Sequence, residues 1–123
     1  MTDRAYCLLY VADPLRSAAF YEGVLGRKPL ESSPGFAMFV LAEGTMLGLW
    51  ARHDVQPAAS AAPGGSEVAL QVADDATVDG LHEKWSRGGL PIAQRPTTMD
   101  FGRTFVALDP DGHRLRVFAP AAR

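Results

Sequence analysis

The side chains that most often bind metals or act as nucleophiles are, in this sequence, three histidines and one cysteine, and their spacing favours neither chemistry. His53 follows an expected strand, His82 lies on an expected helix and His113 lies in an expected turn, so no two are close in the expected fold. Cys7 belongs to a strand face that packs under a helix, whereas a reactive thiolate needs an exposed, electropositive setting. We expect surface or structural roles for the histidines and an inert core role for Cys7.

A second group of polar residues, Glu67, Gln71, Arg114 and Arg116, lies in strand-like segments among apolar and aromatic residues. Carboxylates and guanidinium groups can pair with each other, anchor a polar ligand or take part in acid–base chemistry, and aromatic rings can stack on planar molecules. Which of these is possible depends on the elements that position the side chains.

The composition bounds the class of protein. The chain has 123 residues, of which 47% are hydrophobic and 21% charged, which suits a globular core and not a disordered chain. The net charge is −2, with no basic stripe that would bind nucleic acid. A single cysteine allows no intrachain disulfide and fits a reducing compartment. The apolar run near the N-terminus is too short for a signal peptide or a membrane span. We expect a cytoplasmic protein that binds neither nucleic acid nor membranes.

A hairpin pattern occurs twice. Residues 105–118, FVALDPDGHRLRVF, predict a β-hairpin because Asp-Pro-Asp-Gly between two apolar runs favours a tight turn. Residues 39–49, FVLAEGTMLGL, have the same order of strand, glycine-containing turn and strand. The segment LYVAD at 9–13 also aligns with LQVAD at 70–74, and Gly26 aligns with Gly88. The chain is therefore interpreted as a tandem duplication.

Each half is expected to contain one strand, one helix and three further strands. The first half has strands at 5–12, 28–32, 36–41 and 46–52, with a helix at 15–25 that Asp13 and Pro14 begin and Gly26 ends. The second half has strands at 67–73 and 91–95 before the hairpin, and a helix, begun by Asp74 and Asp75, that carries Val78, Leu81, His82 and Trp85 and ends at Gly88. Residues 96–103 are expected to form a loop.

These elements predict an α+β fold of two tandem βαβββ modules, whose curled mixed sheets surround a groove with the helices on the outer faces. Module 1 spans about residues 4–52, the Pro- and Ala-rich segment 53–65 is a linker, and module 2 spans about residues 66–119. Because a unit of roughly 60 residues is marginally stable alone, we expect the modules to form one domain, residues 1–123.

Strand alternation assigns the side chains to the two faces of each sheet. Val68, Leu70 and Val72 are uniformly apolar and are expected under the helix, so Glu67 and Gln71 face the groove. The same alternation directs further side chains into the groove: Tyr6, Leu8, Tyr10, Met46, Gly48, Trp50, Arg52, Arg114, Arg116 and Phe118. A groove with aromatic walls and a few polar groups is typical of a small-molecule site, although the aromatic cluster could instead be core.

The sequence resembles the vicinal oxygen chelate superfamily, which contains glyoxalase I, extradiol dioxygenases, fosfomycin-resistance enzymes and bleomycin- and mitomycin-binding resistance proteins. The resemblance covers essentially the whole chain. It rests on V-x-D-x-x-x-S-x-x-F-Y-x-x-x-L-G at 11–26 and on F-x-x-x-D-P-D-G-x-x-L at 105–115. These motifs are specific for the superfamily but do not identify one member of it.

The resemblance implies metal ligands at four positions, which in this sequence are Tyr6, Gly48, Glu67 and Arg116. Glycine has no ligand atom, and a guanidinium group repels a divalent cation. Only Glu67 could coordinate, and one carboxylate does not make a site. We therefore expect no metal and no cofactor, and we predict that an ion pair between Glu67 and Arg116 replaces the metal.

The resemblance favours a metal-independent binding protein that holds an aromatic or amphipathic ligand, as the antibiotic-sequestering members do. The expected ligand-binding residues are Tyr6, Tyr10, Trp50, Glu67, Gln71, Phe101, Arg114, Arg116 and Phe118. Family members of this length commonly form homodimers, often with exchanged modules, and the linker permits that arrangement.

Alternatives remain open at this point. One is a metal-free lyase, isomerase or hydrolase that uses Glu67 or Tyr6 as acid or base, and another is a metalloenzyme with relocated ligands. No catalytic residue is assigned. The segment MDFGR at 99–103 is either a lid that carries Phe101 or a plain connection, and Trp85 is expected in helix packing or a dimer contact.

Overall fold

A computed structural model describes residues 3–121, and the chain folds as two compact units that divide between Ala61 and Ala62. The first unit contains β1 (Ala5–Val11), α1 (Pro14–Leu25), β2 (Glu31–Ser32), β3 (Phe36–Ala42) and β4 (Thr45–Ala51). The second unit contains β5 (Glu67–Gln71), α2 (Asp75–Arg87), β6 (Ile92–Met99), β7 (Gly102–Leu108) and β8 (Arg114–Pro120). Both units have the order βαβββ, which confirms the predicted repeat and fold class.

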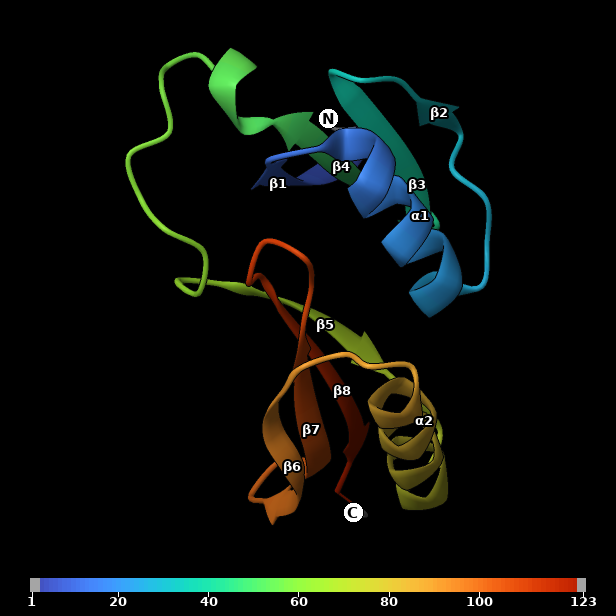
Figure 1. The fold of residues 1–123 in the computed structure, drawn as a ribbon. Coiled ribbons are helices and arrows are strands. Elements are labelled where there is room, and N and C mark those ends of the chain that lie inside the picture. Colours follow the sequence, from blue (N-terminus) through green and yellow to red (C-terminus); the bar gives the residue numbers. More distant parts are fainter. Residues whose placement is uncertain (1–2, 122–123) are drawn as a thin grey trace. The chain divides into compact units, whose positions relative to one another are not determined.

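The two sheets have equivalent topology. Their strand orders are β1-β4-β3-β2 and β5-β8-β7-β6, as Figure 1 shows. In each sheet the first strand runs parallel to the last, and the other neighbours are antiparallel. A parallel neighbour requires a crossover between strands, and the helix of each unit belongs to that crossover. The repeat in the sequence therefore corresponds to a repeat of sheet connectivity.

Both helices begin and end at the residues that their sequences predict. The Asp13 carboxylate accepts hydrogen bonds from the backbone N–H groups of Leu15 and Arg16, and Gly26 ends α1 with φ of 68°. Asp74 accepts from the N–H and hydroxyl groups of Thr77, and these bonds lower the pKa of the Asp74 carboxyl. Among the described residues, no helix combines the length and apolar character that crossing a membrane requires.

Each helix covers one face of its own sheet and buries an apolar core there. In unit 1, Tyr21 of α1 packs against Phe39 with ring centroids 6.5 Å apart. In unit 2, the rings of His82 and Trp85 each contact Phe105 edge-on, with centroids 5.4 Å away. Trp85 is buried, so its predicted role in helix packing is confirmed, and His82 has the structural role that was expected. Cys7 is half-buried, and desolvation raises the pKa of its thiol.

The predicted loop at 96–103 is wrong. β6 continues to Met99, β7 starts at Gly102, and the pairs Thr97–Thr104, Thr98–Arg103 and Met99–Gly102 form a tight hairpin. The register shifts between Gln94 and Thr97, around Pro96. A bulge lets a strand accommodate proline, which cannot donate a ladder hydrogen bond. The proline that indicated a loop therefore lies within a strand, and the segment with Phe101 is the hairpin turn that connects β6 to β7.

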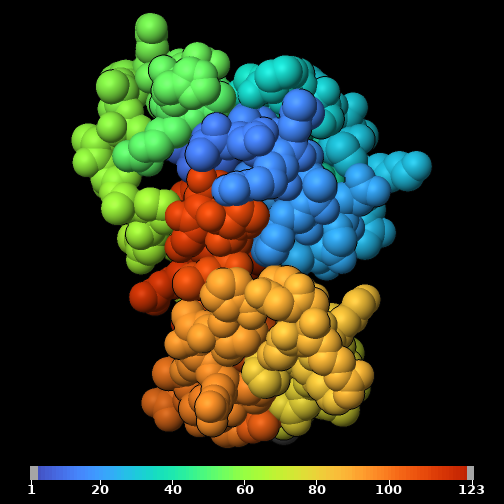
Figure 2. Space-filling model, in the orientation of Figure 1, coloured from blue at the N-terminus to red at the C-terminus, as the bar shows by residue number. Residues whose placement is uncertain are grey.

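Smaller differences occur at other element ends. The predicted strand at 28–32 is reduced to Glu31–Ser32, the strand at 67–73 ends at Gln71, and Arg52–Asp54 forms a 3-10 turn in place of the end of a strand. Val55 is buried and is part of unit 1, so the first residues of the predicted linker belong to that unit. Figure 2 shows the rest of the segment, in green, as a narrow extended strip of side chains.

Gly102 is essential to the hairpin of unit 2. Its φ is 139°, and a Cβ atom there would lie 1.9 Å from the backbone oxygen of Ala119 on β8. We predict that Gly102→Ala lowers the free energy of unfolding by about 3 kcal/mol or more, because the backbone must move to relieve the clash. Gly80→Ala on exposed α2, where no atom lies within 4 Å of the added Cβ, should instead stabilise the protein by about 0.5–1 kcal/mol. Urea unfolding of both variants tests this, and equal effects would contradict it.

Candidate functional site

The face of the second sheet that lies opposite α2 carries the polar residues that the sequence directs there. Val68, Leu115 and Val117 are buried on the helix side, whereas Glu67, Gln71 and Arg114 are exposed and Arg116 is half-buried. Side chains alternate between the two faces along each strand. The parallel register of β5 and β8, in which Ala69 lies opposite Arg116 and Gln71 lies opposite Phe118, places the corresponding residues of both strands on the same face. The predicted assignment of faces in unit 2 is confirmed.

Arg116 and Glu67 form the predicted ion pair. Arg116 Nε lies 2.5 Å from Glu67 Oε1, and Nη2 lies 3.4 Å from Oε2, so the contact is bidentate. The side chains are 19% and 30% exposed, which shields the pair from solvent more than an ordinary surface pair. A bidentate guanidinium–carboxylate contact fixes direction as well as charge. The pair therefore holds both side chains against the sheet.

Two more strands supply acceptors to the same guanidinium group. Arg116 Nη1 donates to Gln94 Oε1 on β6 at 3.0 Å and to Thr104 Oγ1 on β7 at 3.2 Å. Thr104 is buried, and its hydroxyl donates to the backbone oxygen of Val117 at 2.9 Å. Sequence reasoning missed Gln94 and Thr104. Gln94, Val106 and Arg116 lie side by side in the register of β6, β7 and β8, and this register could have identified Gln94 as a partner of Arg116. The bulges in β6 shift the register, so it cannot be read from the alternation of residues in the sequence.

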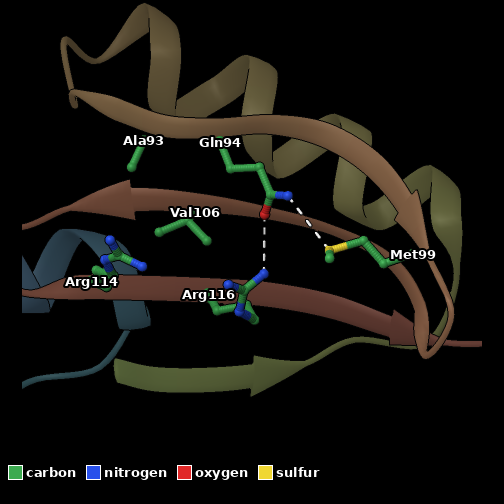
Figure 3. A pocket seen from close by; sticks show the side chains of 6 residues that line it. All are labelled: Ala93, Gln94, Met99, Val106, Arg114 and Arg116. Carbon is green, nitrogen blue, oxygen red and sulfur yellow. Dashed lines mark hydrogen bonds between the residues drawn. The ribbon is translucent and has the colours of Figure 1, made fainter. Parts of the chain in front are cut away.

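A pocket of about 290 Å³ lies beside this network (Figure 3). Its lining residues are Ala93, Gln94, Met99, Val106, Arg114 and Arg116. The Gln94 amide nitrogen lies 3.5 Å from the Met99 sulfur, while its oxygen accepts from Arg116, as the dashed lines in Figure 3 show. The pocket thus combines an apolar floor at Val106 with polar groups on its rim.

Phe101 lies on the hairpin turn and contacts the same cluster. The Arg116 guanidinium carbon is 5.9 Å from the centroid of the Phe101 ring, and the Phe101 and Phe118 rings meet edge-on at 6.1 Å. A cation near an aromatic ring at this distance is attracted to its π face. Phe101, for which the sequence left open a lid or a plain connection, therefore lies on the turn between β6 and β7 beside Arg116.

The corresponding face of unit 1 is aromatic and apolar. Tyr10 and Trp50 meet edge-on with ring centroids 6.2 Å apart, and Tyr6 is 48% exposed. An added Cβ at Gly48 would lie 2.6 Å from Leu8 Cδ2 and 3.0 Å from the Phe36 ring. The side chains of Leu8 and Phe36 therefore fill the space above Gly48. In the described residues this face has no equivalent of the Arg116 network.

The four positions at which a metal is implied do not suit a divalent ion. In unit 1 the Gly48 position is covered by carbon atoms of Leu8 and Phe36. In unit 2 the cation of Arg116 lies against the carboxylate of Glu67, which therefore already has a positively charged partner. Among residues 3–121, no group of three or more His, Cys, Asp or Glu side chains is arranged to hold a metal. The donor set does not fit the metal chemistry that the resemblance implies.

The duplicated βαβββ fold, with one mixed sheet in each unit, defines a class of protein. The chain belongs to the Glyoxalase/Bleomycin resistance protein/Dioxygenase superfamily, whose family model matches residues 4–117. The resemblance inferred from the two motifs is thus confirmed.

Particular relatives are similar over most of the chain. The phenazine antibiotic resistance protein EhpR of Enterobacter agglomerans is 30% identical over 113 residues, which cover 89% of this chain and 86% of EhpR. The solution NMR structure of a protein from Agrobacterium tumefaciens is 50% identical, with a TM-score of 0.88, and covers 99% of this chain and 100% of that one. A glyoxalase-related enzyme from Fulvimarina pelagi shares the fold at 23% identity and a TM-score of 0.83, over 97% of this chain and 88% of that one.

We predict that Arg116→Leu lowers the free energy of unfolding by about 2–3 kcal/mol, because it leaves Glu67 without its counter-charge and removes two further hydrogen bonds. The matched control is Arg87→Leu, which breaks the ion pair with Glu83, whose side chains are 78% and 62% exposed. An exposed pair should contribute less than about 0.5 kcal/mol. Urea unfolding measures both, and a loss in Arg116→Leu no larger than in the control would contradict the prediction.

Proposed function

We propose that the protein binds a small aromatic or amphipathic molecule without a metal ion and acts by sequestering it. The observation that carries the proposal is the bidentate contact of Arg116 with Glu67, at two positions where the resemblance to the superfamily implies metal ligands. An ion pair can orient a polar ligand, but it offers no Lewis acid. Binding is therefore the activity that the site supports best.

The ligand class follows from the aromatic side chains that each unit carries on the sheet face opposite its own helix. Unit 1 offers Tyr6, Tyr10 and Trp50, and unit 2 offers Phe101 and Phe118. Tyr6 and Phe101 are exposed, and the other three rings are half-buried. Accessible aromatic rings favour planar partners, which stack on them or meet their edges. Gln71, Glu67, Arg114 and Arg116 supply polar anchoring in this proposal. Since EhpR is a phenazine antibiotic resistance protein, and phenazines are planar fused aromatic rings, a phenazine-like molecule is the proposed ligand.

A metal-free reaction that uses Glu67 or Tyr6 as acid or base is less well supported. Both oxygens of Glu67 already accept hydrogen bonds from Arg116, so this carboxylate is occupied as a structural partner. Homodimer formation, with or without exchanged modules, and a cytoplasmic location stay predictions of the sequence. The proposal of binding does not depend on them.

The test is a titration of the protein with phenazine, followed by ligand fluorescence or calorimetry, with and without EDTA. We predict saturable binding whose Kd changes less than about twofold on chelation, because no metal takes part. Trp50→Leu should weaken binding about tenfold through lost stacking area. Leu15→Ala, on exposed α1, should leave the Kd unchanged. Absence of binding, or binding that EDTA abolishes, would overturn the proposal.

A further inference from the structure

The polar groups that line the pocket of unit 2 are hydrogen-bond donors. The oxygen of the Gln94 side chain already accepts from Arg116, which turns the amide nitrogen toward Met99. A thioether sulfur is a weak acceptor, and the contact of 3.5 Å is one that a better acceptor can replace. The remaining polar groups, on Arg114 and Arg116, can only donate. A ligand that fits this pocket must therefore bring acceptors.

The two arginines of the pocket differ in how many hydrogen bonds their guanidinium groups already donate within the protein. Arg116 donates from Nε, Nη1 and Nη2 to Glu67, Gln94 and Thr104. Arg114 is the cross-strand neighbour of Glu67 and Leu108, and within the described residues its side chain makes no hydrogen bond or ion pair. Arg116 is thus part of the framework, whereas the fork of Arg114 is available to a ligand at the pocket rim (Figure 3).

The charges at the pocket do not cancel. The carboxylate of Glu67 makes its bidentate contact with Arg116, and Arg114 lies opposite Glu67 in the strand register without an ion pair to it. One positive charge, that of Arg114, remains beside a floor formed by Val106 and Ala93. A guanidinium fork matches the two oxygens of a carboxylate, and such contacts are stronger than neutral hydrogen bonds. The same charge repels a cationic ligand.

From these contacts we propose that the protein selects planar aromatic ligands that carry an anionic group, such as a ring carboxylate. Arg114 binds the anion, and the Gln94 amide nitrogen donates to an acceptor on the ring system. This inference rests on the proposed function, since it specifies the ligand of the same site. It assigns Arg114, and not the paired Arg116, as the residue that determines specificity.

The experiment compares the Kd values of phenazine-1-carboxylate, phenazine and N-methylphenazinium at neutral pH. We expect wild-type protein to bind the carboxylate about tenfold more tightly than phenazine, because one charge-assisted contact is added, and the cation more weakly than either. Raising the salt concentration should narrow the preference for the carboxylate, since the Arg114 guanidinium is exposed.

Two variants that each remove one positive charge separate the effect of Arg114 on the Kd of the carboxylate from the effect of the protein's net charge. Arg114→Gln should bring the Kd of the carboxylate to within about twofold of the Kd that the same variant shows for phenazine. Arg87→Gln, at the end of α2 and outside the pocket lining, should keep the tenfold preference. Melting temperatures of both variants confirm that they fold.

The outcomes distinguish the two proposals. If phenazine and its carboxylate bind with equal Kd, or if Arg114→Gln keeps the preference, then anion selection by Arg114 is wrong while sequestration of planar ligands stands. If none of the three compounds binds, the proposed function itself fails and the anion selection fails with it. A tenfold preference that only Arg114→Gln removes is the result that supports the inference.

Discussion

The contacts of the Arg116 guanidinium group are the interactions on which one face of the second sheet, the face opposite α2, depends. From β8 this group contacts one side chain on each of the other three strands, namely Glu67, Gln94 and Thr104. A charge that is largely removed from water is tolerated only when its donors are satisfied, and this one meets a carboxylate and two neutral oxygens. The group thereby links the whole width of the sheet, and it also turns Gln94 so that the pocket presents donors.

The two units use one connectivity for two different surfaces. The helix-facing sides of both sheets are apolar and buried, because each module of this size must bury what it can. The opposite faces differ: Leu8 and Phe36 close over Gly48 in unit 1, whereas Arg116 and its partners form a polar network in unit 2. Duplication therefore preserved the scaffold, and the residues at equivalent strand positions gave each face its own chemistry.

Local sequence patterns predicted most of the elements for clear physical reasons. Asp13, Pro14 and Gly26 are helix-end residues with specific hydrogen-bonding or backbone roles, and strand alternation placed Glu67 and Arg116 on one face. The prediction of a loop failed at 96–103, where Pro96 lies in the bulged strand β6 and only a tight turn separates β6 from β7. Partner strands override local propensity in such segments, because their ladder hydrogen bonds are formed with residues of another strand.

The sequence by itself determined the duplication, the identity of the core faces and the presence of a cation at a position where the resemblance to the superfamily implies a metal ligand, because each depends on residue type and short-range periodicity. Only the tertiary structure decided which acceptors meet Arg116 and which arginine remains available to a ligand. Gln94 and Thr104 reach Arg116 through the register of β6, β7 and β8, and that register passes through irregular positions in β6. A shift of one residue would turn these side chains to the opposite face, so the network exists only once the strands have paired.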